Sequence, residues 1–304
     1  MPELPEVETV RRGLQQLVVG RRVMGCEVLN PGSYSGVSQL EDATFTAARR
    51  RAKLLLLDLD GEHTLAIHLK MTGQLVVRGV EDWGGGHPSD SLVDALPDRS
   101  TRVIIDLDDG SRLFFNDQRK FGWMRLLPTE EADALAAGLG PEPMDPDAWR
   151  RFRERIRRHD RTVIKAALLN QTVVAGIGNI YADEALWSAR VHPETRVGAL
   201  SDRALKRILL AAAEVMTLSI ELGGSTSRNY VNAQGERGAY LDFAAVFGRQ
   251  GQPCRHCGKT IIKTRVAGRG THMCPTCQPT PPVHCRDIRK NRPETADLKR
   301  ISRQ

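Results

Sequence analysis

The chain has 304 residues, of which 40% are hydrophobic and 27% are charged. These proportions indicate a globular protein with room for two domains, and they exclude a fibrous or largely disordered chain. No window approaches the roughly 18 apolar residues of a membrane-spanning helix, and the first residues are acids and prolines instead of a secretion signal. We therefore expect a cytoplasmic protein without membrane contact. The formal net charge of +7 favours a polyanionic partner.

The first residues carry the pattern of an amphipathic helix. Val7, Val10 and Leu14 recur at helical spacing, and Gly20 is placed where a helix would end. The spacing predicts a helix over residues 2–19.

Strand signals follow the predicted helix. Four runs of strand-forming residues lie in pairs around the turn signals Asp60-Gly61 and Asp109-Gly110. The runs cover residues 45–59, 64–77, 102–107 and 111–115. Short strands separated by turn signals predict a β-sandwich or barrel-like domain. The residues at 81–100 are rich in Gly, Pro and Asp, and we expect them to form a long loop.

After Pro128 the composition changes to Ala, Leu and Arg, and a proline-rich linker is predicted at 141–146. The helices predicted beyond it cover residues 147–170, 180–189 and 201–222. The fold class is therefore α+β and multidomain. We predict an N-terminal β-sandwich domain with its helix, a helical domain, a zinc hairpin and a basic, disordered tail, over residues 1–140, 141–250, 251–278 and 279–304.

Four of the six cysteines form two Cys-x2-Cys pairs with 16 residues between them. The pairs are Cys254 with Cys257 and Cys274 with Cys277. In a reducing compartment this spacing predicts one structural zinc ion, because two short turns present four thiolates in tetrahedral geometry. His256 and His272 lie close enough in sequence to compete as ligands, although four cysteines already complete such a site.

The extreme N-terminus offers a nucleophile. If Met1 is removed, Pro2 presents a secondary amine beside Glu3 and Glu6 at the start of a helix. The positive end of the helix lowers the pKa of that amine, and a neutral amine can attack an electrophilic sugar carbon to form an iminium. Glu3 could then transfer protons. The alternative is that proline and acids in the first turn are ordinary helix-start signals.

The sequence resembles the formamidopyrimidine-DNA glycosylases, bacterial enzymes that repair oxidised purines. The resemblance rests on motifs that occur in order along the chain. They are Pro2–Thr9 with Arg11-Arg12-Gly13, Arg50–Lys53, His68–Gly73, Asp117–Gly122, Gly176–Glu184, Gly223–Thr226, and the four cysteines with Gly268–His272. The resemblance implies that the helical domain is of the helix–two-turn–helix type and that DNA binds in the cleft between the domains.

The resemblance also implies catalytic roles. Pro2 is expected to attack the sugar C1′ as a Schiff-base nucleophile, with Glu3 as proton donor and Glu6 as a supporting acid. Lys53 would donate the proton for β-elimination; taken alone, it would be a solvent-facing strand lysine. Arg269 in the zinc hairpin would serve δ-elimination and hold a phosphate, which its guanidinium fork suits.

The target base must leave the stack to be reached. The resemblance implies that Met71, Arg119 and Phe121 fill the resulting gap, with Arg119 pairing the orphaned base. Plain core packing is the alternative for Met71 and Phe121.

Further DNA contacts are expected from the helical domain and from one strand. Asn179 is predicted to cap a helix whose N-terminal amides point outward and bind a phosphate, with Lys165 beside it; a simple N-cap is compatible with this role. Arg161 and Arg102 complete the set of expected DNA contacts. Residues 150–165 carry eight Arg or Lys, which suits the same partner or a solvated helix face.

The predicted function is base-excision repair of double-stranded DNA with oxidised bases or abasic sites, followed by strand cleavage through β,δ-elimination, by a monomer in the nucleoid region. The resemblance implies that residues 225–238 fold over the extruded base; an exposed linker between a helix and the zinc hairpin is the alternative. Gln118 and Ser100 depart from the family pattern, where proline and histidine are usual.

Two alternative functions remain. One is an endonuclease VIII-type enzyme for oxidised pyrimidines, against which Leu4 argues, and the other is a zinc-containing DNA-binding protein without catalysis.

Overall fold

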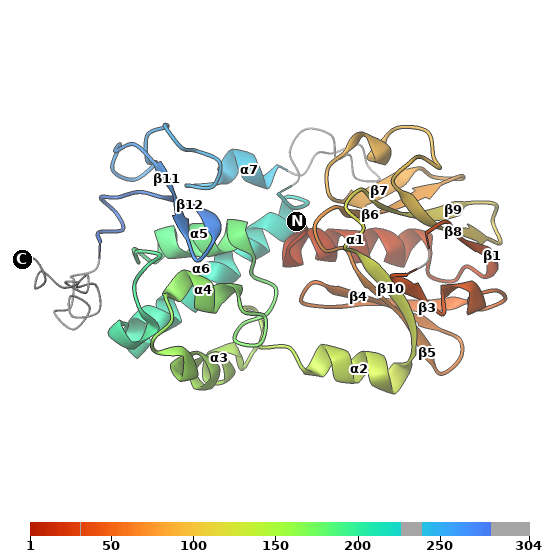
Figure 1. Cartoon of the computed structure of the whole chain (residues 1–304), viewed down its shortest axis with the longest axis horizontal. Helices are drawn as coiled ribbons and strands as arrows, with labels where there is room; N and C mark the ends of the chain where they lie inside the picture. The colour runs from red at the N-terminus through yellow and green to blue at the C-terminus, as the bar shows by residue number, and fades with distance from the viewer. Residues whose placement is uncertain (31, 226–238, 281–304) are drawn as a thin grey trace, which may run out of the picture.

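The computed structural model describes residues 1–30, 32–225 and 239–280, which form a sheet-rich half and a helical half. A small hairpin lies on the helical half, and helix α2 (Thr129–Ala137) packs against the sheet-rich half before the chain enters the helical half (Figure 1). The predicted α+β architecture is confirmed. The loop predicted to cover an extruded base lies, from residue 226 to 238, outside the described residues, and so does the tail from residue 281 onward.

The sheet-rich half is a sandwich of two five-stranded sheets. One sheet has the order β1-β8-β9-β6-β7 and the other β2-β10-β5-β4-β3. The first comprises β1 (Val23–Val28), β8 (Thr101–Leu107), β9 (Arg112–Asp117), β6 (Gly73–Arg78) and β7 (Trp83–Gly86). The second comprises β2 (Tyr34–Ser35), β10 (Trp123–Pro128), β5 (His63–His68), β4 (Leu54–Leu59) and β3 (Phe45–Arg51). Apolar side chains from both sheets form one buried core between them.

Each of the first two predicted runs is in fact two strands. The run at 45–59 turns at Ala52 and Lys53, where Ala52 adopts a φ of 53°. Neither residue is a usual turn former, so composition gave no signal for the turn. The predicted loop at 81–100 contains strand β7. Its glycines are poor strand formers, but Gly85 lets α1 approach, because a Cβ there would lie 2.8 Å from Val10.

The helical half is built from α3 (Ala148–Ile156), α4 (Ile164–Leu169), α5 (Asn179–Ser188), α6 (Asp202–Glu221) and α7 (Tyr240–Phe243). The helix predicted over 147–170 is divided into α3, a 3-10 turn at Arg157–His159 and α4. Helix α3 buries Phe152 and Ile156 and turns most of its arginines outward. The other 3-10 turns are Val37–Gln39, Asp90–Leu92 and Val197–Ala199.

Helix α1 (Leu4–Leu17) joins the two halves. Leu4 belongs to the core of the helical half, whereas Val7, Val10 and Leu14 belong to the sandwich core. The close approach at Leu4 needs a glycine, because a Cβ on Gly176 would lie 2.5 Å from Leu4 Cδ1. The N-terminus therefore lies at the junction of the two halves (Figure 1).

The C-terminal hairpin pairs β11 (Ile262–Val266) with β12 (Arg269–Met273) in antiparallel register. Two acids of α5 hold this region. Asp183 accepts the backbone N–H of His272 at 2.8 Å, and Glu184 accepts the N–H groups of Ala245, Val246 and Phe247 at 2.7 to 2.9 Å. Within the described residues, no helix has the length and apolar character needed to cross a membrane.

Candidate functional site

The chain begins inside a cluster of ionisable side chains. Glu3 is the N-cap of α1, and its backbone N–H donates to Glu6 Oε2 at 2.8 Å, which forms a capping box. Burial lowers the pKa of the terminal amine of Met1; nearby Glu3 and Glu6 oppose this shift, and Lys53 adds to it. An amine at this position thus loses its proton more readily than an exposed one, which suits a nucleophile.

Glu3 is almost completely buried, at 2% exposure, against the N-terminus of α5. Its carboxylate accepts the backbone N–H groups of Gly178 at 2.7 Å, Ile180 at 3.0 Å and Tyr181 at 3.4 Å. Gly178 is required there, because a Cβ would lie 2.2 Å from Glu3 Cδ. Burial raises the pKa of Glu3 to about 7, although Lys53 and the backbone N–H groups oppose the shift. A carboxyl group of this kind can donate a proton near neutral pH.

This contact corrects one expectation. Three amides around the start of α5, which the sequence predicted to bind a phosphate, instead bind the Glu3 carboxylate. The N-cap of α5 is Gly178, and Asn179 is the first helical residue. The Asn179 side chain donates to the carbonyl of Gly270 in the hairpin at 3.0 Å, while its buried Oδ1 has no partner among the described residues.

Lys53 lies in the turn between β3 and β4 and points at the same cluster. It is 7% exposed, and its Nζ donates to the carbonyl of Ile177 at 2.9 Å. Burial lowers its pKa, Glu3 and Glu6 oppose the shift, and Arg269 adds to it. The lysine is therefore a buried group of the cluster and not a solvent-facing strand residue. Arg269, at the first position of β12, is exposed and close enough to act on Lys53.

The three residues expected to enter the DNA stack lie on two adjoining loops. Phe121 is 53% exposed and Met71 is half-buried, so core packing does not account for Phe121. The guanidinium of Arg119 stacks on the Phe121 ring at 4.9 Å. The buried Asp117 joins the loops: it hydrogen-bonds with the Thr72 hydroxyl and accepts the N–H groups of Arg119 and Gly122. Sequence reasoning gave Asp117 no role, although an acid at the end of a strand, just before a turn with Arg119 and Lys120, is a signal for one.

Two predicted DNA contacts are buried instead. Lys165 has no exposed surface, and its Nζ donates to Asp183 at 2.7 Å, to Thr271 Oγ1 at 2.7 Å and to the carbonyl of Gly270 at 3.1 Å. All three donors of this ammonium are used, so direct phosphate contact by Lys165 is ruled out in this arrangement. The lysine joins α4, α5 and β12.

Arg102 is also buried, at 7% exposure, and donates to the backbone carbonyls of Asp117, Arg99 and Thr101. It therefore supports the loop that carries Arg119. Arg161, in contrast, is exposed between α3 and α4, where a partner can reach it.

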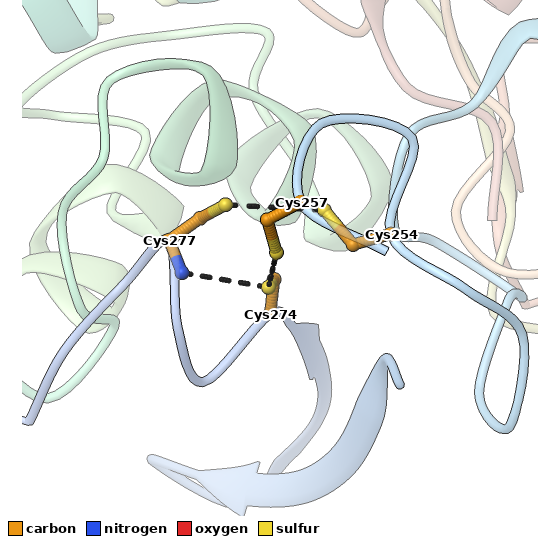
Figure 2. Close-up of side chains that lie close together, drawn as sticks. All are labelled: Cys254, Cys257, Cys274 and Cys277. Carbon is orange, nitrogen blue, oxygen red and sulfur yellow. Dashed lines mark hydrogen bonds between the residues drawn. The ribbon is translucent and has the colours of Figure 1, made fainter. Parts of the chain in front are cut away.

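The four predicted zinc ligands come together (Figure 2). The sulfur atoms of Cys254, Cys257, Cys274 and Cys277 all lie within 4.8 Å of one another. Burial acts to raise the pKa of Cys254, but the backbone N–H groups of Cys257 and His256 outweigh it and bring that pKa to about 6, whereas the pKa values of Cys274 and Cys277 are raised. Four cysteine sulfurs with this spacing fit a tetrahedral zinc ion. Neither His256 nor His272 belongs to the cluster.

Sequence reasoning missed three residues of α5 that arrange these sites: Tyr181, Asp183 and Glu184. All are buried and hydrogen-bonded. The available signal was the acidic pair Asp183-Glu184 inside an otherwise apolar helix. Buried charges need partners, so such a pair indicates that the helix holds other segments.

The chain thus combines a cluster of buried carboxylates and a buried lysine at its N-terminus with a β-sandwich, a helical region and a four-cysteine site that fits zinc. Together with the comparisons with known proteins, these features define a multidomain DNA-repair glycosylase. Three family models match in order: the formamidopyrimidine-DNA glycosylase N-terminal domain at residues 1–124, its H2TH domain at 139–231, and the zinc finger found in FPG and IleRS at 251–280. The chain belongs to the formamidopyrimidine-DNA glycosylase family, and its function is base excision in DNA repair.

Relatives match over nearly the whole chain. The formamidopyrimidine-DNA glycosylase of Streptococcus thermophilus is 43% identical over 286 residues, covering 91% of this chain and 99% of the relative. That of Symbiobacterium thermophilum is 43% identical over 303 residues, covering 96% and 94%. A Lactococcus lactis mutant bound to DNA containing Fapy-dG has a TM-score of 0.80 and 35% identity, covering 92% and 100%. The Lactococcus lactis enzyme bound to abasic-site DNA has a TM-score of 0.80 and 33% identity, covering 91% and 100%.

Proposed function

We propose that this glycosylase removes oxidised purines from double-stranded DNA and then cleaves the strand at the abasic site, with the amine of Pro2 as nucleophile. The observation that carries the proposal is the convergence of Glu3, Glu6 and Lys53 on the chain terminus, where burial lowers the pKa of the Met1 terminal amine, raises that of Glu3 and lowers that of Lys53. A DNA-binding module without catalysis would leave these buried ionisable groups without a purpose.

The proposed chemistry begins when Met1 has been removed and the neutral Pro2 amine attacks C1′ of the lesion nucleotide. The bond to the base breaks, Glu3 supplies a proton, and the sugar remains bound to Pro2 as an iminium. Loss of a C2′ proton then expels the 3′ phosphate in β-elimination, with Lys53 taking part in proton transfer as the resemblance implies. Arg269 would hold the second phosphate, which leaves in δ-elimination, and water releases the sugar remnant from Pro2.

The DNA would lie across the junction of the halves, and the loops that carry Met71, Arg119 and Phe121 would enter its base stack. We propose that residues 1–140 form the catalytic domain, that 141–250 and the hairpin at 251–278 hold the DNA backbone, and that Arg161 contributes to this contact. Zinc would supply folding energy to the hairpin and no chemistry. The enzyme is proposed to act as a monomer at the nucleoid.

The proposal is tested by single-turnover cleavage of matched duplexes that contain 8-oxoguanine, an oxidised pyrimidine or an abasic site. We expect cleavage of the first and third, and much slower cleavage of the second. One Lactococcus lactis relative has been crystallised with DNA containing an oxidised pyrimidine, so the pyrimidine arm is needed. A preference for that arm would assign the chain to the endonuclease VIII type. Binding to all three without cleavage of any would contradict an enzyme.

A further inference from the structure

Tyr181 on α5 is the one residue among those described that hydrogen-bonds to the carboxylates of both Glu3 and Glu6. It is completely buried. Its backbone N–H donates to Glu3 Oε2 at 3.4 Å, and its hydroxyl donates to Glu6 Oε1 at 2.7 Å. A second hydroxyl lies behind it, because Ser219 Oγ of α6 is 2.6 Å from the tyrosine oxygen.

The direction of this hydroxyl chain follows from proton counting. A tyrosine hydroxyl has one proton, and a carboxylate can only accept, so the Tyr181 proton points to Glu6. The contact between Tyr181 and Ser219 then requires that Ser219 be the donor. The order is Ser219 to Tyr181 to Glu6, and each hydrogen bond polarises the next. Burial and the nearby Glu6 and Glu3 raise the pKa of Tyr181 well above its usual range, so the hydroxyl keeps its proton at any working pH.

Glu6 in turn holds two segments of backbone that are far apart in sequence. Its Oε2 accepts the N–H of Glu3 at 2.8 Å, which fixes the peptide that follows Pro2. Its Oε1 accepts the N–H of Ser225 at 2.8 Å, just after α6. Gly224, with a φ of 95°, makes this approach possible. A rotation of the Glu6 carboxylate would therefore move both segments.

We propose that Tyr181, oriented by Ser219, is a positioning residue that locks the Glu6 carboxylate and thereby aligns the Pro2 amine with its target carbon. This inference rests on the proposed function. It assigns to α5 a task beyond packing, since one residue fixes Glu3 through its backbone and Glu6 through its side chain. Without the hydroxyl, Glu6 retains its two backbone donors but can rotate about them, and the amine loses its fixed attack geometry.

The test compares Tyr181→Phe with Tyr240→Phe. Tyr240 is an almost completely buried tyrosine whose ring centroid lies 5.4 Å from that of Tyr181, but its hydroxyl faces Glu184 at 3.5 Å. Both variants remove one buried hydroxyl from the same region. The readouts are the rate of borohydride-trapped adduct formation on an abasic duplex at saturating protein, the dissociation constant of that duplex, and the melting temperature.

We expect Tyr181→Phe to slow trapping by about 10- to 100-fold, the range for loss of a hydrogen bond to a buried charge, with the dissociation constant near that of the wild type. Tyr240→Phe should trap at close to the wild-type rate. Ser219→Ala, which leaves the bond to Glu6 in place, should slow trapping less than Tyr181→Phe. Adding Tyr181→Phe to Glu6→Gln should have little further effect, because the two residues act through one bond.

Equal slowing by Tyr181→Phe and Tyr240→Phe would overturn the proposal, as would full-rate trapping by Tyr181→Phe or multiplicative effects in the double variant. If Tyr181→Phe does not fold, trapping by Ser219→Ala at the full rate would overturn it. Failure of the proposed function gives a different result, because the wild-type protein itself would then form no adduct.

Discussion

Two buried polar clusters contact neighbouring turns of α5, and they differ in how completely their charges are paired. The first cluster contains Glu3, Glu6 and Lys53, and the second contains Lys165 and Asp183. In the first, Lys53 has a single carbonyl as its acceptor among the described residues, and the pKa of Glu3 is raised to about 7. In the second, Lys165 is completely buried, with Asp183 and two further acceptors around its ammonium group. The two clusters therefore have different roles. A fully paired buried charge holds elements of the fold together, whereas an incompletely paired one is available for proton transfer.

The largest effect is expected at the zinc hairpin, which the second cluster holds against α4 and α5. Cys254→Ser should release zinc and unfold the hairpin, because a structural zinc ion contributes about 10 kcal/mol or more to a module this small. The measurements are metal content and lesion-duplex affinity. Cys26→Ser is the control, since Cys26 lies in β1 outside the cluster. Metal-free protein with full affinity would mean that the hairpin folds without the ion.

The next effect concerns the first cluster. Glu3→Gln keeps the size of the side chain but removes the acid, and base excision should slow by about 10²- to 10⁴-fold. In the wild type, excision should rise with pH as the amine loses its proton and fall above about pH 7 as Glu3 ionises. The residual activity of Glu3→Gln should lack the fall. A pH profile unchanged by the substitution would exclude Glu3 as the proton donor.

The same pKa affects stability. Because the pKa of Glu3 is raised from 4.5 to about 7 on folding, the folded state binds more protons than the unfolded state between these values. The free energy of unfolding of the wild type should therefore fall by about 3 kcal/mol relative to Glu3→Gln as the pH rises through this window. Urea unfolding at pH 5 and pH 8 measures the difference.

Lys165→Met tests whether the second cluster stabilises the fold. It leaves Asp183 buried without its cation, so we expect a loss of about 3–5 kcal/mol in the free energy of unfolding. Lys53→Met should instead impair strand cleavage with much less loss of stability, because no fully buried ion pair is broken. Urea denaturation and abasic-site cleavage of both variants provide the check. A stable Lys165→Met with reduced salt dependence of DNA binding would restore the phosphate role predicted from sequence.

The smallest effect is expected at the surface. Arg161→Ala should leave stability unchanged, weaken duplex binding severalfold and reduce the slope of log affinity against log salt by about 1. Arg150→Ala is a matched control in the same basic stretch, because Arg150 is paired with Asp147. Equal behaviour of the two variants would indicate that only the summed charge of the stretch matters.

The sequence predicted the sandwich, the order of the parts and the four cysteines, because turn signals and Cys-x2-Cys spacing act locally. It did not predict the turn at Ala52 and Lys53, since neither residue is a turn former. It placed Lys165 on the DNA, because a lone lysine carries no sign of a partner such as Asp183, 18 residues further along. It read the start of α5 as a phosphate site, because the Glu3 carboxylate reaches it from 175 residues away.

Nucleophilic attack by the Pro2 amine is the central claim, and one measurement tests it most directly. Borohydride should trap the wild-type protein on a duplex containing 8-oxoguanine, and mass spectrometry of the digested adduct should find the sugar remnant on an N-terminal peptide that begins with Pro2. Pro2→Gly should form the adduct far more slowly. An adduct on Lys53 or another lysine, or a retained Met1 in a fully active protein, would contradict the account.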